Sequence, residues 1–361
     1  MTIDALIDKL ITKNNPFAVW SLPECQSPEI ITGKITRLSA FHQTNGLEGF
    51  VFAPFQITED LPVFVIKPDI RLKNKQEIED FDIDSLHEIN AKPCVTGDFF
   101  ITEEAYLDDI RQTINEINET GLSKVIISRS IMKEREKESL GNLYMSLQEI
   151  APEAFIYIVN IPDAGLWMGA SPEPLLISHG ETMETVSLAG TQSRNPDSEY
   201  YWHTKDIEEQ AFVSRYMLDV LYRFGITDYT TRGPESMESG TVAHLKTSFR
   251  FPAEKIENNL GGFIAALHPT PAVCGLPKEE ASAFIQKVEK HNRQYYTGFL
   301  GPWKIDGQIN LYVNLRCMQI TDEQYIIYSG GGITSRSIPE EEWTETGKKA
   351  QILLDTINRV K

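Results

Sequence analysis

Acidic side chains near the C-terminus are spaced so that they could bind a cation. A helix is expected to begin near Pro339, with Ser337 as its N-cap. At 3.6 residues per turn, Glu342, Glu345 and Lys349 share one face of this helix. The face continues into an apolar stripe made of Leu353, Ile357 and Val360. Carboxylates in such a buried position need a cation or strong hydrogen-bond donors, whereas the simpler alternative is a solvated helix end favoured by the helix dipole.

A further carboxylate, Glu209, is predicted on the buried face of a distant helix over residues 204–224. It is in line with an apolar stripe formed by Phe212, Val213, Tyr216 and Val220. Two carboxylates brought together in the interior would repel each other unless a cation bridged them. Oxygen-only ligation by few protein groups favours magnesium over zinc. The pattern therefore predicts a magnesium site shared by the two helices.

Two other side chains could serve as a base and an acid. Lys124 begins the apolar segment SKVIISRSI, which is predicted to be a buried strand. A desolvated lysine favours its neutral form and can then accept a proton, although most lysines at strand ends extend to solvent. Glu173 lies between Pro172 and Pro174 and is held rigidly, either as a positioned acid or as an exposed turn residue.

Glycines beside these segments could admit an anionic ligand. Glycines 330–332 precede the C-terminal helix as an expected loop, and Gly190 and Thr191 end another predicted strand. Without a Cβ atom, glycine lets backbone N–H groups approach a ligand closely, and Thr191 adds a hydroxyl group. Arg316 and Asn314 are expected on one side of the strand LYVNLRC, where the arginine could bind a carboxylate.

The elements that must position these residues alternate along the chain. A helix is expected from its N-cap Thr102 to Gly121, and further helices over residues 142–150 and through Phe284 and Val288. Strands are expected at FIYIVNI, GLWMGASPEPLLIS (broken by the turn SPEP), TVSLAGTQSR, TVAHLKTSFRF and YIIYS. His244 lies in one of these strands, where a lone histidine is more often structural than a ligand.

Composition limits the class of protein. The chain has 361 residues, of which 41% are hydrophobic, and this suits one large domain or two smaller ones. The formal net charge of -18 argues against nucleic-acid binding and requires local positive charge wherever an anion binds. The four cysteines form no CxxC pair, and neither a signal peptide nor a membrane span is evident, so a cytoplasmic protein is expected.

Eight segments occur in the order typical of chorismate-utilising enzymes: SKVIISRS, GASPEPLL, SLAGT, KDIEEQ, HPTPAVCGLP, NRQYYTGFLG, VNLRC and SGGGITSRSIPEEEWTETGKK. The chain resembles this family, and within it the isochorismate synthases. The motif-bearing part is residues 101–361, and residues 1–100 match only by position. The resemblance implies an α/β (α+β) fold with a single large chorismate-binding domain over 1–361. A layered β-sheet core with helices packed outside would enclose a deep cleft.

The resemblance also implies magnesium-dependent conversion of chorismate to isochorismate. Lys124 would be the general base that activates water for attack at C2 of the ring. Glu173 would be the general acid that protonates the departing C4 hydroxyl. This chemistry needs a neutral base and a protonated acid near pH 7, and desolvation favours both forms.

A set of binding residues follows from the same motif match. Glu209 and Glu345 would bind the metal, and the metal would hold the ring carboxylate. Glu342 would contact the metal through a water molecule, or would contact the residues that bind it. Side chains that hold the enolpyruvyl carboxylate or line the cleft would be Tyr296, Arg316 and Lys349. The remaining substrate contacts would be Gly190, Thr191, Gly330 and Gly332 through backbone or hydroxyl groups, and His244 and Ala272 near the ring.

Alternative reactions remain open. Relatives that use ammonia generally lack the lysine found here as Lys124, and aminodeoxychorismate synthases carry a lysine where this chain has Ala189, so water is the expected nucleophile. Salicylate synthases share the lysine but go on to eliminate pyruvate, and the HPTPAVCG loop resembles the isochorismate synthases more closely. A non-catalytic chorismate-binding homologue is the third alternative, disfavoured because base, acid and metal carboxylates are all present.

Two positions depart from the family pattern, and partners follow from the expected reaction. Gln210 after Glu209 replaces a frequent histidine, which keeps hydrogen bonding without a titratable group, and metal binding is expected to survive. Pro174 replaces a commoner leucine. No glutaminase subunit is expected because water is the nucleophile, and a monomer is favoured. The sequence does not distinguish menaquinone from siderophore biosynthesis as the use of the product.

Overall fold

The computed structural model describes residues 1–361 except 26, 45, 89–100, 195–198, 240–241 and 361. Its sixteen strands form one sheet in the order β10-β11-β9-β8-β14-β13-β3-β4-β2-β1-β6-β7-β15-β16-β5-β12. The strands are β1 (Phe17–Ser21), β2 (Glu29–Leu38), β3 (Gly49–Ala53), β4 (Val63–Leu72), β5 (Lys124–Glu134), β6 (Phe155–Ile161), β7 (Gly165–Ser171), β8 (Pro174–His179), β9 (Thr182–Ser193), β10 (Thr230–Ser239), β11 (Val242–Pro252), β12 (Gly275–Leu276), β13 (Phe299–Ile305), β14 (Gln308–Val313), β15 (Cys317–Ile320) and β16 (Gln324–Ile333). The first hundred residues contribute β1 to β4, which lie in the middle of this order.

The sheet is bent so that strands near both ends of its order face one another. Residues of β9 and β11 line the same pocket as residues of β5 and β16. Between the two halves lies an aromatic core, whose members come from strands and the loops joining them. Phe52 on β3 contacts Trp167 on β7 there, with ring centroids 6.0 Å apart. Burial of such large rings on both inner faces is what makes the two halves pack as layers.

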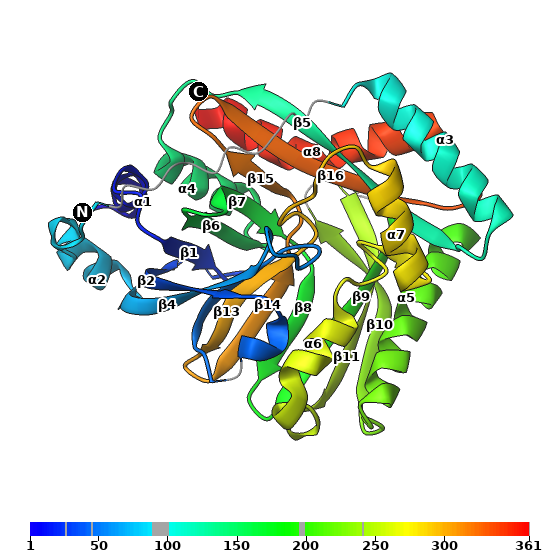
Figure 1. The fold of residues 1–361 in the computed structure, drawn as a ribbon, viewed down its shortest axis with the longest axis horizontal. Helices are drawn as coiled ribbons and strands as arrows, with labels where there is room; N and C mark the ends of the chain where they lie inside the picture. Colours follow the sequence, from blue (N-terminus) through cyan, green and yellow to red (C-terminus); the bar gives the residue numbers. More distant parts are fainter. Residues whose placement is uncertain (26, 45, 89–100, 195–198, 240–241, 361) are drawn as a thin grey trace.

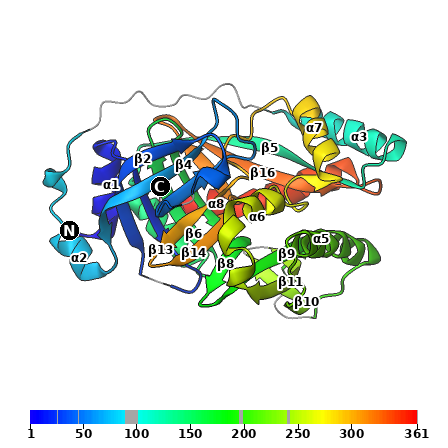
Figure 2. The ribbon, with the colours of Figure 1, turned by 60° about the horizontal axis from the view of Figure 1, so that its bottom comes forward.

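Helices cover the outside of both halves (Figures 1 and 2). They are α1 (Ile3–Thr12), α2 (Lys75–Asp80), α3 (Glu103–Glu119), α4 (Leu140–Ile150), α5 (Thr204–Arg223), α6 (Leu260–Leu267), α7 (Lys278–Val288) and α8 (Pro339–Val360). Helix α5 packs on β9 and β11, α8 packs on β16, and α3 and α7 pack on β5. The layered core with outer helices agrees with the expected fold.

Most predicted elements are confirmed. Helix α3 begins after Thr102, whose hydroxyl accepts a hydrogen bond from the N–H of Ala105 at 3.2 Å. Within its apolar stripe, Ile110 and Ile117 are buried, as amphipathic spacing predicts. The turn SPEP separates β7 from β8 as expected. Among the described helices, none combines the length and apolar composition that a membrane crossing requires.

Three local predictions are wrong. Glycines 330–332 are part of β16 and not a loop, because they pair in register with β5. The strand predicted over LYVNLRC stops at Val313, and Arg316 adopts a φ of 48°, so alternation does not orient its side chain. Ser337 does not cap α8 as predicted, because its hydroxyl accepts a hydrogen bond from the N–H of Thr334 instead.

Candidate active site

One pocket collects the side chains predicted to act on the substrate. It lies where β5 and β16 face β9 and β11, with α5 and α8 contributing from outside. Every residue predicted for the site lines it: Lys124, Glu173, Gly190, Thr191, Glu209, His244, Ala272, Tyr296, Arg316, Gly330, Gly332, Glu342, Glu345 and Lys349. Segments up to 225 positions apart in sequence, from β5 to α8, therefore meet at one place.

Lys124 is buried at the start of β5 and forms an ion pair across the pocket. Its Nζ atom lies 2.5 Å from Oε1 of Glu209 on α5. The side chain of the lysine is 6% exposed and that of the glutamate 16% exposed. Lys124 is thus a pocket residue held by a carboxylate, and not a strand-end lysine extended to solvent.

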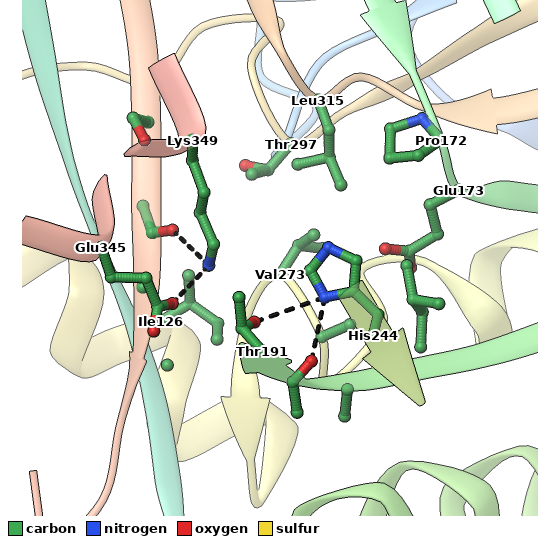
Figure 3. A pocket seen from close by; sticks show the side chains of 18 of the residues that line it. Ile126, Pro172, Glu173, Thr191, His244, Val273, Thr297, Leu315, Glu345 and Lys349 are labelled. Atoms are coloured by element: carbon green, nitrogen blue, oxygen red, sulfur yellow. Dashed lines mark hydrogen bonds and ion pairs between the residues drawn. The ribbon is translucent and has the colours of Figure 1, made fainter. Parts of the chain in front are cut away.

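A second lysine–carboxylate pair lies on α8. Nζ of Lys349 is 2.7 Å from Oε1 of Glu345 and donates to the carbonyl oxygen of Gly330 at 3.2 Å. Figure 3 shows this pair on one side of the pocket and Glu173 on the other, with Thr191 and His244 between them. Each of the two lysines that line the pocket is therefore paired with a carboxylate from a helix.

The glycines of β16 let the acidic side chains approach the strand. A Cβ atom added at Gly332 would lie 3.3 Å from Oε1 of Glu209. One added at Gly331 would lie 3.0 Å from Oε2 of Glu342 and 3.9 Å from Oε1 of Glu345. Carboxylates from α5 and α8 thus lie beside two consecutive glycines of β16, and the metal site that they would share stays a prediction.

The oxygen-only donor set has the composition that magnesium prefers. However, the described residues contain no group of three or more acidic, histidine or cysteine side chains already spaced to hold a metal ion. Glu209 and Glu345 are each engaged by a lysine. The residues therefore fit magnesium by the chemistry of their oxygen donors, although the lysines engage Oε1 of each carboxylate.

Glu173 is positioned by its backbone in the link from β7 to β8. Its N–H donates to Oγ of Ser171 at 3.3 Å, and its carbonyl oxygen accepts from the N–H of Val313 at 2.9 Å. The residue is 3% exposed. Burial raises the pKa of its carboxyl group to about 7, although the positive charges of Lys124, Arg316 and Lys349 act in the opposite direction. A carboxyl group with this pKa can carry a proton near neutrality. The burial of Glu173 excludes the alternative of an exposed turn residue.

His244 is a neutral pocket residue linked to the end of β9. Its Nδ1 atom lies 2.9 Å from the carbonyl oxygen of Gly190 and 3.3 Å from Oγ1 of Thr191. Burial, together with the charges of Arg316 and Lys349, lowers its pKa to about 3. Gly190 adopts a φ of +69°, and a Cβ atom there would lie 3.1 Å from Cβ of Asp206, so glycine suits this position.

Several lining residues were not predicted, and one helix face was misjudged. The missed residues include Ile126, Pro172, Leu188, Asp206, Val273, Thr297, Leu315 and Tyr328. On α5, Phe212 is exposed, contrary to the predicted stripe, whereas Gln210 is buried at 3% exposure. Gln210 donates to Oγ of Ser187 and Oγ1 of Thr247, which places Glu209 at the edge of the packed face and inside the pocket.

Comparison with known proteins defines the class. The model of the family described as chorismate binding enzyme matches residues 57–358. The chain belongs to this family, as the ordered motifs and the layered fold indicate. The match includes part of the first hundred residues, which the motifs alone did not reach.

Relatives of the chain include isochorismate synthases. The chain is 31% identical over 260 residues to the vibriobactin-specific isochorismate synthase of Vibrio cholerae, covering 70% of this chain and 66% of the relative. It is 31% identical over 244 residues to isochorismate synthase EntC of Escherichia coli K12, covering 65% and 62%. These alignments span slightly less than two thirds of each relative. The fold matches that of MenF, the menaquinone-specific isochorismate synthase from Escherichia coli, with a TM-score of 0.79, 20% identity and coverage of 97% and 91%.

Proposed function

We propose that the protein converts chorismate to isochorismate. The observation that carries the proposal is the placement of Lys124 and the buried acid Glu173 in one pocket with Glu209 and Glu345. The isochorismate synthases among its relatives support the same reaction. Substrate positioning by Lys349 and Arg316 suits a dianionic ligand.

The proposed reaction adds one water and releases one water. Lys124 accepts a proton from the attacking water as its oxygen bonds to C2 of the ring. The ring double bonds shift, and the C4 hydroxyl leaves with a proton from Glu173. Lys124 then carries one proton more and Glu173 one fewer, and exchange with solvent restores both. The pKa of about 7 for Glu173 suits an acid that must be protonated before each turnover and reprotonated after it.

Glu209 and Glu345, with Glu342 close by, would hold magnesium, which when bound supplies positive charge for the ring carboxylate of the substrate. Turning Glu209 away from Lys124 would release the amine from its carboxylate partner. The main-chain groups of Gly190 and Gly330 and the hydroxyl of Thr191 would fix the ring. Tyr296, His244 and Ala272 would form its walls.

The test is product analysis. Purified protein is incubated with chorismate and MgCl₂, and the products are separated by liquid chromatography, with pyruvate measured by a coupled lactate dehydrogenase assay. Isochorismate without pyruvate is the expected result. Salicylate together with pyruvate would show the lyase alternative, and unchanged chorismate would show a binding protein.

A further inference from the structure

A buried ion pair lies behind the pocket wall formed by β5. Nη2 of Arg293 is 2.6 Å from Oε1 of Glu289, and Nε donates to Oε2 at 2.8 Å. Both side chains are 3% exposed. Removing two charges from water is costly, and such pairs persist where their other hydrogen-bonding groups are also satisfied. The partners of those remaining groups therefore indicate what the pair holds in place.

The three N–H groups of Arg293 not used by Glu289 reach three separate walls of the pocket. Nη2 donates to the carbonyl oxygen of Ile126 at 2.7 Å. Nη1 donates to the carbonyl oxygen of Val273 at 2.8 Å and to Oγ1 of Thr297 at 3.4 Å. Ile126, Val273 and Thr297 all line the pocket. One guanidinium group thus joins three lining segments, and each of its five N–H groups has an acceptor.

Glu289 holds β5 at a second point. Its Oε1 atom accepts hydrogen bonds from the N–H of Ser128 at 2.7 Å and from the Ser128 hydroxyl at 2.9 Å. Nε2 of His291 lies 3.0 Å from the same hydroxyl. The ion pair therefore binds β5 at residues 126 and 128, a few positions after Lys124. These contacts set the start of the strand against the wall that contains Val273.

We propose that Arg293 is a positioning residue, which fixes the segment bearing Lys124 against the Val273 wall so that the amine meets the substrate ring. The inference rests on the proposed function. Lys349 and Glu345 are held by contacts of their own on α8 and β16. Loss of the Arg293 guanidinium group should therefore impair turnover more than substrate binding. A displacement of about 1 Å at a reacting group can lower turnover roughly 100-fold.

The test is the Arg293→Lys variant. Lysine keeps the charge that Glu289 requires but offers three donors from one nitrogen in place of a planar fork. The matched control is Arg359→Lys, because Arg359 is an exposed partner of Glu149. The kcat and KM for chorismate and the thermal unfolding midpoint are measured for each. The expected result for Arg293→Lys is a kcat lowered at least tenfold with KM changed less than about threefold, and wild-type values for the control.

Ser128→Ala is a milder second variant that removes only a hydroxyl from the same network. It should lower kcat in the same direction, by less, and it decides the question if Arg293→Lys does not fold. A folded Arg293→Lys protein with wild-type kcat, or one whose KM rises as much as its kcat falls, would overturn the inference. If Arg293→Lys does not fold, wild-type kcat in Ser128→Ala would overturn it. A wild-type protein that makes no isochorismate would overturn the proposed function, and this inference with it.

Discussion

The substitution Glu173→Gln separates the chemical role of this side chain from its role in stability. Glutamine has nearly the same shape but carries no titratable proton. Glu173 is 3% exposed, and burial raises its pKa from the ordinary 4.5 to about 7. That difference corresponds to a cost of about 3 kcal/mol for holding the ionised carboxylate in the folded protein.

The sign of the stability effect follows from proton linkage. The folded state binds this proton more tightly than the unfolded state. The protonated carboxyl group therefore contributes fully to the free energy of unfolding below about pH 4.5, and this contribution is lost as the pH rises through about 7. The free energy of unfolding of Glu173→Gln relative to wild type should therefore increase by about 3 kcal/mol between pH 4.5 and pH 8. Urea unfolding of both proteins at the two pH values measures this change.

The activity of the wild type should also depend on this proton. Wild-type kcat/KM should fall above about pH 7, because the free protein then loses the proton that the leaving hydroxyl needs. Glu173→Gln should lower kcat by roughly 10²–10⁴-fold below about pH 7, where the wild-type carboxyl group carries its proton. A variant with near-wild-type turnover would refute the assignment of the acid. If the difference in unfolding free energy between Glu173→Gln and wild type is the same at both pH values, the argument from burial is refuted.

Three other outcomes are expected. Lys124→Ala should abolish turnover while chorismate binding, measured by calorimetry, is largely retained; wild-type turnover would rule out this lysine as the base. EDTA should remove activity and added Mg²⁺ should restore it, whereas full activity without divalent ions would exclude the metal. Arg129→Lys should lower the free energy of unfolding in urea by about 1–2 kcal/mol. The reason is that Cζ of Arg129 lies 3.5 Å from the Trp343 ring centroid and Nε donates to Oγ1 of Thr346. An unchanged unfolding midpoint would contradict this reasoning.

Local patterns in the sequence predicted much of the fold and of the pocket. The period of 3.6 residues identified α3 and placed Glu345 and Lys349 together on α8, because that geometry is set within one helix. The ordered motifs predicted Lys124 and Glu173 in one pocket, and both residues line it in the structure. The chemical roles of these residues stay predictions.

Features that depend on distant partners could not be predicted. Glycines 330–332 suggest a loop by composition, but pairing with β5 makes them a strand. Arg316 departs from strand geometry with a φ of 48°. Two of the partners of Arg293 are the carbonyl oxygens of Ile126 and Val273, and because every residue carries such a group, no side-chain pattern marks these two. Gln210 faces the core because Ser187 and Thr247 offer it hydrogen bonds there, and no local spacing shows those bonds.

The convergence of Glu209 and Glu345 on one cation is tested most directly by a crystal structure with Mn²⁺ in place of Mg²⁺ and chorismate bound. We expect one anomalous peak within bonding distance of both carboxylates, with Lys124 no longer paired to Glu209. A crystal with chorismate in the pocket and no Mn²⁺ at these carboxylates, or with Mn²⁺ bound elsewhere, would contradict the shared site.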